Sequence, residues 1–273
     1  MKSFFVGKIT LIRRFLQIGT WIFFFVVYYT SHRQSFFLGS FYSFKIGPIH
    51  IVDPYIYLTY LFRNLFKPDF YIFTIMGFFI PILIAFFLGR VFCSWVCPYN
   101  FLYEILEYLK TLFLKRKPLF YFMTSSRNKK IWLIIALFLG TFISPLPYYL
   151  LMPGLLSVLL HQLILHLYSL ILFSTLLIIT ILVIDLFFKK RIWCNFICPT
   201  GIILGLAKWK RGLRVLKRED LTCKECALCS FECPLGLTPH LGNHLENCYN
   251  CGKCVDTCMA LRKKENPLSF KIL

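Results

Sequence analysis

The longest uncharged run in the sequence extends from residue 131 to residue 184, and its 54 residues include no Asp, Glu, Lys or Arg. About 20 apolar residues are enough to cross the hydrocarbon core of a bilayer, so this run is too long for a single span. Four residues near its middle would break a continuous helix: Pro145, Pro147, Pro153 and Gly154. We therefore predict two spans, over about 131–150 and 167–187, and expect the segment between them to lie in or dip into the outer interface.

Two further uncharged runs, 15–31 and 70–89, predict two more spans. The composition agrees, because 58% of the residues are hydrophobic and 16% are charged, against about 25% charged residues in soluble domains. We therefore expect an α-helical integral membrane protein with four transmembrane helices, surrounded by membrane lipid. The net charge of +19 does not indicate a nucleic-acid partner, since the basic residues cluster beside the apolar runs.

The distribution of basic residues sets the expected orientation. Segment 90–130 carries eight Lys and Arg residues and segment 189–218 carries nine, whereas the turn between the third and fourth spans carries none. Arg13 and Arg14 belong to a basic flank before the first span. Because basic flanks stay in the cytoplasm, we expect a multi-pass protein of the bacterial inner (cytoplasmic) membrane with its N- and C-termini in the cytoplasm.

The phrase Arg-x-x-Cys-x-x-x-Cys-Pro occurs twice, as RVFCSWVCP at 90–98 and as RIWCNFICP at 191–199, each time at the end of an apolar run. This pattern predicts two repeated hairpins, each followed by a cysteine pair, related by a pseudo-two-fold axis along the membrane normal. Cysteines four residues apart lie on one face of an α-helix. The proline after each pair either ends that helix or begins the next one.

Three interpretations fit the cysteines of these motifs, which are Cys93, Cys97, Cys194 and Cys198. They could be small buried structural residues, form redox-active thiol pairs, or meet on the pseudo-two-fold axis and hold a shared metal site or third iron–sulfur cluster. The shared site explains the duplication. It also gives Arg90 and Arg191 a role, because a guanidinium offsets the negative charge of a thiolate-bound cluster. Otherwise both arginines are inside-positive anchors.

The segment CKECALCSFECP at 223–234 has the Cys-x2-Cys-x2-Cys-x3-Cys-Pro spacing of bacterial [4Fe-4S] ferredoxins, and CYNCGKCVDTC at 248–258 repeats it, with Met259 in place of the proline. A zinc site would use one or two Cys-x2-Cys pairs, and a reducing cytoplasm disfavours disulfides. We predict two [4Fe-4S] clusters in a cytoplasmic α+β ferredoxin-like domain over 219–262, which follows a membrane domain over 1–218. Since the fourth cysteine of each run binds the other cluster, the expected ligand sets are Cys223, Cys226, Cys229 and Cys258, and Cys248, Cys251, Cys254 and Cys233.

An amphipathic stretch follows each Cys-x3-Cys-Pro motif, FLYEILEYLKTLFLK after the first and GIILGLAKWKRGLRVLK after the second. Their basic faces suit the anionic inner leaflet. We interpret them as interfacial helices that hold the motifs and the ferredoxin-like domain against the membrane. The alternative is a solvated basic face with no further role.

Together, the four spans, the two Cys-x3-Cys-Pro motifs and the two ferredoxin runs resemble the NapH family of membrane quinol dehydrogenase components, over residues 15–258. NosR, MauN and CcoG proteins share parts of this pattern. The resemblance implies oxidation of menaquinol or ubiquinol from the quinone pool. It also implies electron transfer through iron–sulfur clusters to a NapG-like periplasmic ferredoxin-type protein and a downstream periplasmic reductase, for nitrate or nitrous oxide. Two other functions stay open: a CcoG-like assembly or maturation factor for a metalloenzyme, and a redox sensor.

Quinol oxidation needs a base within hydrogen-bond reach, and ionisable groups at membrane depth are the candidates. We consider His161 and His166 in the outer uncharged segment and Asp185 near the inner end of the fourth span. Asp53 is expected near the outer end of a span. Each histidine could equally be an interfacial residue that hydrogen-bonds to headgroups or water, and Asp185 could pair with Lys189.

Overall fold

The computed structural model describes most of the chain, namely residues 7–30, 37–64, 72–113, 126–143, 145–164, 166–187, 191–209, 212–217, 223, 226–241, 247–262 and 267–272. Two stretches are long and apolar enough to cross a membrane, residues Lys8–Val27 of α1 (Lys8–Thr30) and the whole of α8 (Tyr168–Phe187). Shorter apolar stretches lie in α3 (Ile72–Leu88) and α7 (Met152–Ile164). By length and composition, two of the four expected spans are thus found within the described residues.

The third expected span, 131–150, ends earlier than predicted. Helix α5 covers Ser126–Phe142, and a separate short helix, α6 (Leu146–Leu150), follows it. Pro145 and Pro147 explain the break, because a proline removes a backbone donor and its ring clashes with the preceding helical turn. Helix α7 then packs into the core beside α8 through its buried residues Met152, Leu155 and Leu156. The segment between the last two expected spans therefore enters the helix bundle.

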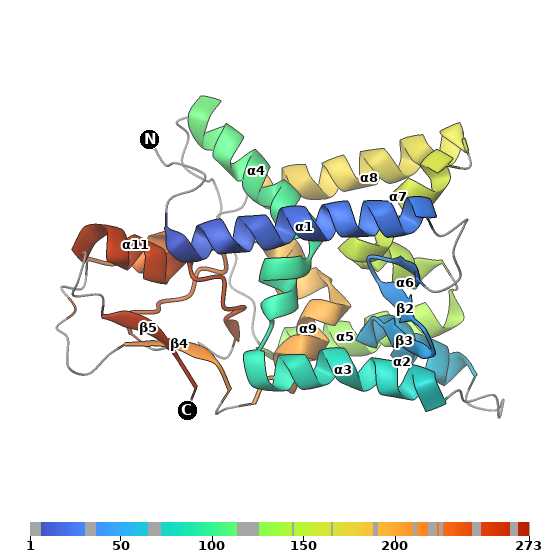
Figure 1. Cartoon of the computed structure of the whole chain (residues 1–273), viewed down its shortest axis with the longest axis horizontal. Helices are drawn as coiled ribbons and strands as arrows, with labels where there is room; N and C mark the ends of the chain where they lie inside the picture. Colours follow the sequence, from blue (N-terminus) through green and yellow to red (C-terminus); the bar gives the residue numbers. More distant parts are fainter. Residues whose placement is uncertain are drawn as a thin grey trace.

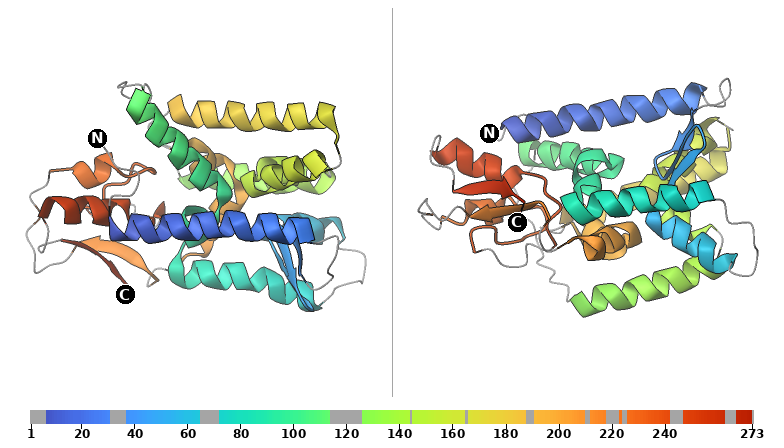
Figure 2. Two further views of the ribbon diagram at one scale, coloured as in Figure 1. Left: turned by 45° about the horizontal axis from the view of Figure 1, so that its top comes forward. Right: turned by 60° about the horizontal axis from the view of Figure 1, so that its bottom comes forward.

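The helices of the two halves cross over at the cysteine motifs. Helices α1, α3, α5 and α8 run roughly along the long axis of the molecule (Figures 1 and 2). Helix α3, which precedes the first motif, packs against α9 (Pro199–Ala207), which follows the second, and α8 packs in turn against α4 (Pro98–Phe113). Helices α1 and α5 pack against the first and second motif, respectively. This exchange fits a duplicated chain, in which contacts between the halves add to the contacts within each half.

A small antiparallel sheet, which the sequence analysis did not predict, lies between α1 and α3 in the chain. It has the order β1 (Phe37–Ser40), β2 (Ser43–Ile46), β3 (Ile49–Val52), with β2 and β3 joined by a tight turn at Gly47 and Pro48. Gly47 has φ 54°, a conformation that glycine adopts readily. Strand β3 packs against α3 and leads into α2 (Pro54–Arg63).

The C-terminal module combines two short strands with two helices. Strands β4 (Arg214–Lys217) and β5 (Leu268–Lys271) pair antiparallel and pack beside α10 (Leu228–Phe231) and α11 (Lys253–Arg262). The two strands lie on either side of segment 219–262 in the sequence. The module sits at the end of the molecule where α1 begins (Figure 1).

The expected amphipathic helices after the motifs differ from the structure in one case. The second stretch, 201–217, is not one interfacial helix, because α9 ends at Ala207 and residues Arg214–Lys217 form strand β4. The six residues 199–204 of α9 are all buried, as their small and aliphatic side chains allow inside a bundle. The first stretch does form helix α4, and one of its faces is buried in the protein, through Tyr99, Asn100, Tyr103 and Glu104.

Candidate iron–sulfur sites

The two Cys-x3-Cys-Pro motifs fold alike. Each forms a π-helical turn, η1 (Phe92–Val96) and η2 (Trp193–Ile197), in place of the α-helical face expected from the spacing. The N–H of Cys97 donates to the Phe92 carbonyl at 2.9 Å, and the N–H of Cys198 donates to the Trp193 carbonyl at 2.8 Å. Such wide turns are rare and are frequently found at functional sites. The following prolines begin α4 and α9, which is the second of the two roles expected for them.

The crossing of the halves brings the four motif cysteines together into what we call the four-cysteine group: Cys93, Cys97, Cys194 and Cys198. Burial, and next the neighbouring Cys93 thiol, raise the pKa of the Cys97 thiol to about 12. Burial raises the pKa of Cys198 as well, and the Cys93 thiol raises it further. The same holds for Cys194, whose pKa the Cys97 thiol raises after burial. Burial and the neighbouring thiols thus disfavour the thiolate forms, whereas a bound metal centre would favour them.

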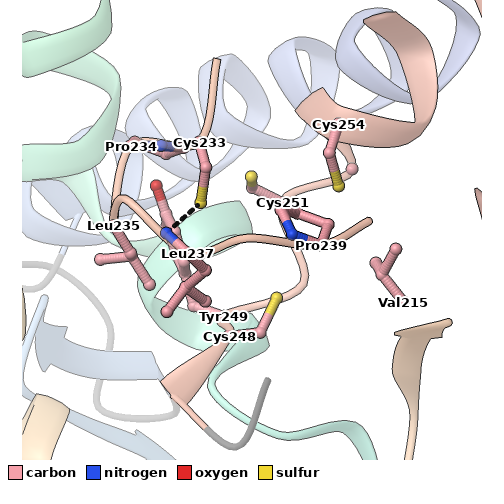
Figure 3. Close-up of a pocket in the computed structure, with 11 residues that line it drawn as sticks. Val215, Cys233, Pro234, Leu235, Leu237, Pro239, Cys248, Tyr249, Cys251 and Cys254 are labelled. Carbon is pink, nitrogen blue, oxygen red and sulfur yellow. Dashed lines mark hydrogen bonds between the residues drawn. The ribbon is translucent and has the colours of Figure 1, made fainter. Parts of the chain in front are cut away.

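A second set of cysteines surrounds one pocket in the C-terminal module. We call Cys233, Cys248, Cys251 and Cys254 the inner group, and all four line this pocket together with Leu235, Leu237 and Tyr249. Their sulfur atoms face a common space, and the Leu237 N–H donates to the Cys233 sulfur at 3.3 Å (Figure 3). The Asn250 N–H donates to the Cys248 sulfur at 3.4 Å. Backbone donors of this kind stabilise thiolates. These four residues are one of the two ligand sets expected from the sequence.

The remaining cysteines form an outer group, Cys223, Cys226, Cys229 and Cys258. Cys229 and Cys258 pack in one core with Cys254 of the inner group. The Cys223 thiol lies within electrostatic range of Cys229, whereas Cys226 is exposed. His240 approaches this group, because its Nδ1 lies 3.6 Å from the Cys229 sulfur and 3.0 Å from the Ser230 hydroxyl.

The inner group and the four-cysteine group are neighbours. Cys93 packs against the buried cluster that contains Cys251, and Cys233 packs against the same cluster. Hydrogen bonds fasten the module onto both motif turns: Ser94 Oγ donates to the Tyr249 carbonyl at 2.5 Å, Trp95 Nε1 to the Asn250 carbonyl at 3.0 Å, and Arg191 N to the Pro234 carbonyl at 3.1 Å. The module is thus docked on the cysteine motifs and is not a loosely attached tail.

The two motif arginines are buried and do not anchor at a surface. Arg90 is 2% exposed and Arg191 1% exposed. Arg90 Nη2 donates to the Cys194 carbonyl at 2.7 Å, and its charge favours the thiolate of Cys93. The charge of Arg191 likewise favours the thiolates of Cys97 and Cys194. Their positions match the charge-compensating role expected for them at a shared site.

Sequence analysis missed a buried ion-pair network beside these groups. The Glu104 carboxylate, which is fully buried, lies 3.1 Å from Arg13 and from Arg191 and 3.2 Å from Lys253, and it also pairs with Arg14. Arg13 and Arg14, which the sequence assigns to a basic surface flank, are therefore buried. The available signal was the spacing of Tyr99, Asn100, Tyr103 and Glu104, which places Glu104 on the buried face of α4.

The residues present fit thiolate-bound clusters. Within the described part of the chain, Arg13 Nε and Nη2, Arg191 Nε and Nη1 and Arg90 Nε are buried nitrogen atoms that make no hydrogen bond. Buried cationic donors require anions nearby, and an oxidised [4Fe-4S] cluster with four thiolates carries a charge of about −2. No three described His, Cys, Asp or Glu side chains lie close enough to hold a single metal ion.

Two buried carboxylates flank the four-cysteine group. Asp185 accepts hydrogen bonds from the Tyr99 hydroxyl at 2.5 Å and from the N–H groups of Ile192 and Trp193 at 3.1 Å. The sequence places Asp53 near the outer end of a span, whereas in the structure it accepts a hydrogen bond from Thr200, two residues after Cys198, at 2.6 Å. The alternative partner of Asp185, Lys189, lies outside the described residues.

The structure does not bring the three quinol-site candidates together. His161 and His166 are exposed and lie at the connection between α7 and α8. Asp185 lies near the other end of α8, about 26 Å away along the helix axis at 1.5 Å per residue from Tyr168. Only Asp185 is beside a cysteine group.

Comparisons with known proteins agree with this duplicated arrangement. A family described as a 4Fe-4S binding domain matches the chain twice, over residues 70–119 and 165–218. Each match contains one Cys-x3-Cys-Pro motif, and both lie before the ferredoxin runs of the C-terminal module. No solved structure matches the chain significantly.

Three curated relatives illustrate the similarity. The uncharacterized protein MJ0750 of Methanocaldococcus jannaschii is 26% identical over 195 residues, which cover 69% of this chain and 75% of that protein. The ferredoxin-type protein NapH of Escherichia coli is 27% identical over 62% of this chain and 59% of its own length. The methylamine utilization ferredoxin-type protein MauN of Paracoccus denitrificans is 27% identical over 72% and 64%, respectively. The resemblance seen in the sequence is confirmed: the chain is similar to ferredoxin-type proteins of the NapH and MauN kind.

Proposed function

We propose that the protein is a membrane electron-transfer protein that oxidises a quinol and passes the electrons through iron–sulfur clusters to a partner. The observation that carries this proposal is the continuous series of cysteine groups. Cys229 and Cys258 of the outer group pack with Cys254 of the inner group, and Cys251 of the inner group packs near Cys93 of the four-cysteine group. Clusters held at these groups would supply one-electron transfer.

The ligand sets proposed for the clusters follow the three groups. The outer group would hold the first ferredoxin cluster and the inner group the second. The four-cysteine group would hold a third [4Fe-4S] cluster, which the two matches to a 4Fe-4S binding domain support. The buried arginines beside the inner and four-cysteine groups would offset the charge of the bound clusters.

We place four spans in the membrane, formed by α1, α3, α5 and α8, with both termini and all cysteine groups on the cytoplasmic side of the inner membrane. The hydropathy of α1 and α8 supports this placement. So does the packing of the C-terminal module against the start of α1 and both motif turns, because it gathers these segments at one side.

Quinol oxidation to quinone releases two electrons and two protons, so the site needs a proton acceptor close to the first electron acceptor. Asp185 is the candidate that the geometry favours, because it lies beside Cys194 and binds the Tyr99 hydroxyl. The electrons would leave one at a time toward an electron-transfer partner. The resemblance of the motifs to the NapH family implies a NapG-like periplasmic ferredoxin-type protein and a periplasmic reductase of nitrate or nitrous oxide.

Rapid-mixing EPR on anaerobically purified protein in lipid tests the proposal. The clusters are reduced chemically and mixed with a menaquinone analogue. We expect fast, saturable reoxidation that a quinol-site inhibitor blocks and that Cys194→Ser abolishes. Cys226→Ser is the matched control, because it removes one ligand from the distant outer group and should leave reoxidation of the remaining clusters intact.

Iron content separates the parts of the proposal. The wild-type chain should hold about 12 iron atoms, and a variant without the four motif cysteines should lose about four of them. An unchanged number of iron atoms in this variant would refute the third cluster. Intact clusters that a quinone never reoxidises would overturn the quinol reaction. Copper bound at the four-cysteine group would instead indicate an assembly factor.

A further inference from the structure

The buried network around Glu104 joins four segments that are far apart in the sequence. Glu104 comes from α4, Arg13 and Arg14 from α1, Arg191 from the start of the second motif, and Lys253 from α11. The four cations face two carboxylates, since Lys253 also lies 3.3 Å from Glu107. Glu107 is 42% exposed, whereas the side chain of Glu104 is 0% exposed.

The cations of this network reach both the inner group and the four-cysteine group. Arg13 lies within electrostatic range of Cys251. Arg191 acts on Cys97 and Cys194, and its guanidinium lies 4.3 Å from the centre of the Tyr103 ring. Lys253 directly precedes Cys254 in the sequence. The Glu104 carboxylate therefore pairs with cations that act on both cysteine groups.

The charge of Glu104 is permanent at neutral pH. Burial alone would raise the pKa of this carboxyl, but the charges of Lys253, Arg13 and Arg191 lower it well below its usual range. Charges in a dry interior act over longer distances than charges in water, because the surrounding dielectric screens them less. A fixed carboxylate here must influence any group nearby that gains or loses an electron.

We propose that Glu104 is a positioning residue that sets the reduction potentials of the clusters at the inner group and the four-cysteine group. This inference rests on the proposed function, because it requires clusters at these groups. Reduction adds one negative charge to a cluster. A nearby carboxylate disfavours that charge, whereas the guanidinium groups that it orients favour it. Removing the carboxylate should therefore raise the potentials, and removing an arginine should lower them.

EPR-monitored redox titration of the whole protein in lipid measures these potentials. Glu104→Gln should raise the equilibrium constant for reduction about tenfold for at least one of the clusters at the inner group and the four-cysteine group. A tenfold change equals an upward shift of about 59 mV in the reduction potential for one electron. Arg13→Gln should shift the cluster at Cys251 in the opposite direction. Glu107→Gln is the matched control on the same helix, and its shift should be less than a third as large, because water screens this exposed carboxylate.

A second variant covers the case in which Glu104→Gln fails to fold. Glu104→Asp keeps the charge. The equilibrium constants for reduction of its clusters should therefore stay within twofold of the wild-type values, even if the protein becomes less stable. The inference is overturned if Glu104→Gln and Glu107→Gln shift the potentials equally, or if Arg13→Gln raises them. Absence of cluster signals from the wild-type protein is a different outcome, because it refutes the proposed function itself.

Discussion

Replacing Asp256 should loosen the C-terminal module from the start of α1. Asp256 of α11 accepts hydrogen bonds from the Thr10 N–H at 2.7 Å, the Thr10 hydroxyl at 2.6 Å and the Ile9 N–H at 3.3 Å. The first N–H groups of a helix have no partner within the helix, so Asp256 caps α1 from a distant part of the chain. A carboxylate near a helix N-terminus also interacts favourably with the helix dipole.

The size of the effect follows from these bonds. Hydrogen bonds to charged groups contribute about 1.5–3 kcal/mol each, and the long bond to Ile9 adds little. Because water partly replaces lost bonds, we expect Asp256→Ala to weaken the docking of α11 on α1 by about 3 kcal/mol. Since each 1.4 kcal/mol is tenfold in an equilibrium constant, local opening should become about 100-fold more frequent.

Hydrogen–deuterium exchange measured by mass spectrometry can follow this opening at the peptide that contains Thr10. Asp256→Ala should accelerate exchange there by about 100-fold, and Asp256→Asn, which keeps one acceptor oxygen, by less. Thr257→Ala is the control, because the Thr257 hydroxyl donates to the Lys253 carbonyl within α11. Unchanged exchange at Thr10 in Asp256→Ala, or equal acceleration in Thr257→Ala, would refute the reasoning.

Two further predictions concern packing and pH. A methyl group at Gly77 of α3 would overlap the backbone of His50, so Gly77→Ala should abolish the folded peak in size-exclusion chromatography. Gly19→Ala is the contrasting variant, because nothing lies within 4 Å of the added carbon. Its free energy of unfolding should rise by up to about 1 kcal/mol through helix propensity. Burial raises the pKa of Asp53 from 3.8 to about 6, so its contribution to stability is complete below pH 3.8 and is lost as the pH rises through 6. The loss is about 3 kcal/mol at most. Thermal unfolding measured in detergent between pH 4 and pH 7 should show this loss in the wild type but not in Asp53→Asn. An equal dependence of the free energy of unfolding on pH in both proteins would contradict this assignment.

Local sequence patterns predicted the parts of the structure that local spacing determines. The prolines at positions 98 and 199 begin helices, and the ferredoxin spacing identifies the cysteines that surround the pocket of the inner group. The sheet of β1, β2 and β3 escaped notice, because its strands have four residues each and lie between long apolar helices whose composition dominates the region. The third span was placed too far along the chain because hydrophobicity continues across Pro145 while the helix does not.

Contacts between distant segments could not be predicted from spacing. The partners of Glu104 cannot be predicted from local spacing, since they come from positions 13, 14, 191 and 253. The contact of Asp53 with the second motif was missed for a similar reason. Its position depends on Thr200, which is 147 residues away in the chain. Patterns within one helix report which face is buried, but they do not report what covers it.

The docking of the C-terminal module has a consequence for biogenesis. Tyr249 and Asn250 cover the first motif turn, and Cys97 is only 7% exposed, whereas Cys226 is open to solvent. If the four-cysteine group holds the proposed cluster, iron delivered by a maturation machinery reaches it most readily before the module closes over it. Loading should therefore proceed from the membrane outward, with the outer group filled last, and a nascent chain that closes too early would be trapped without its innermost metal.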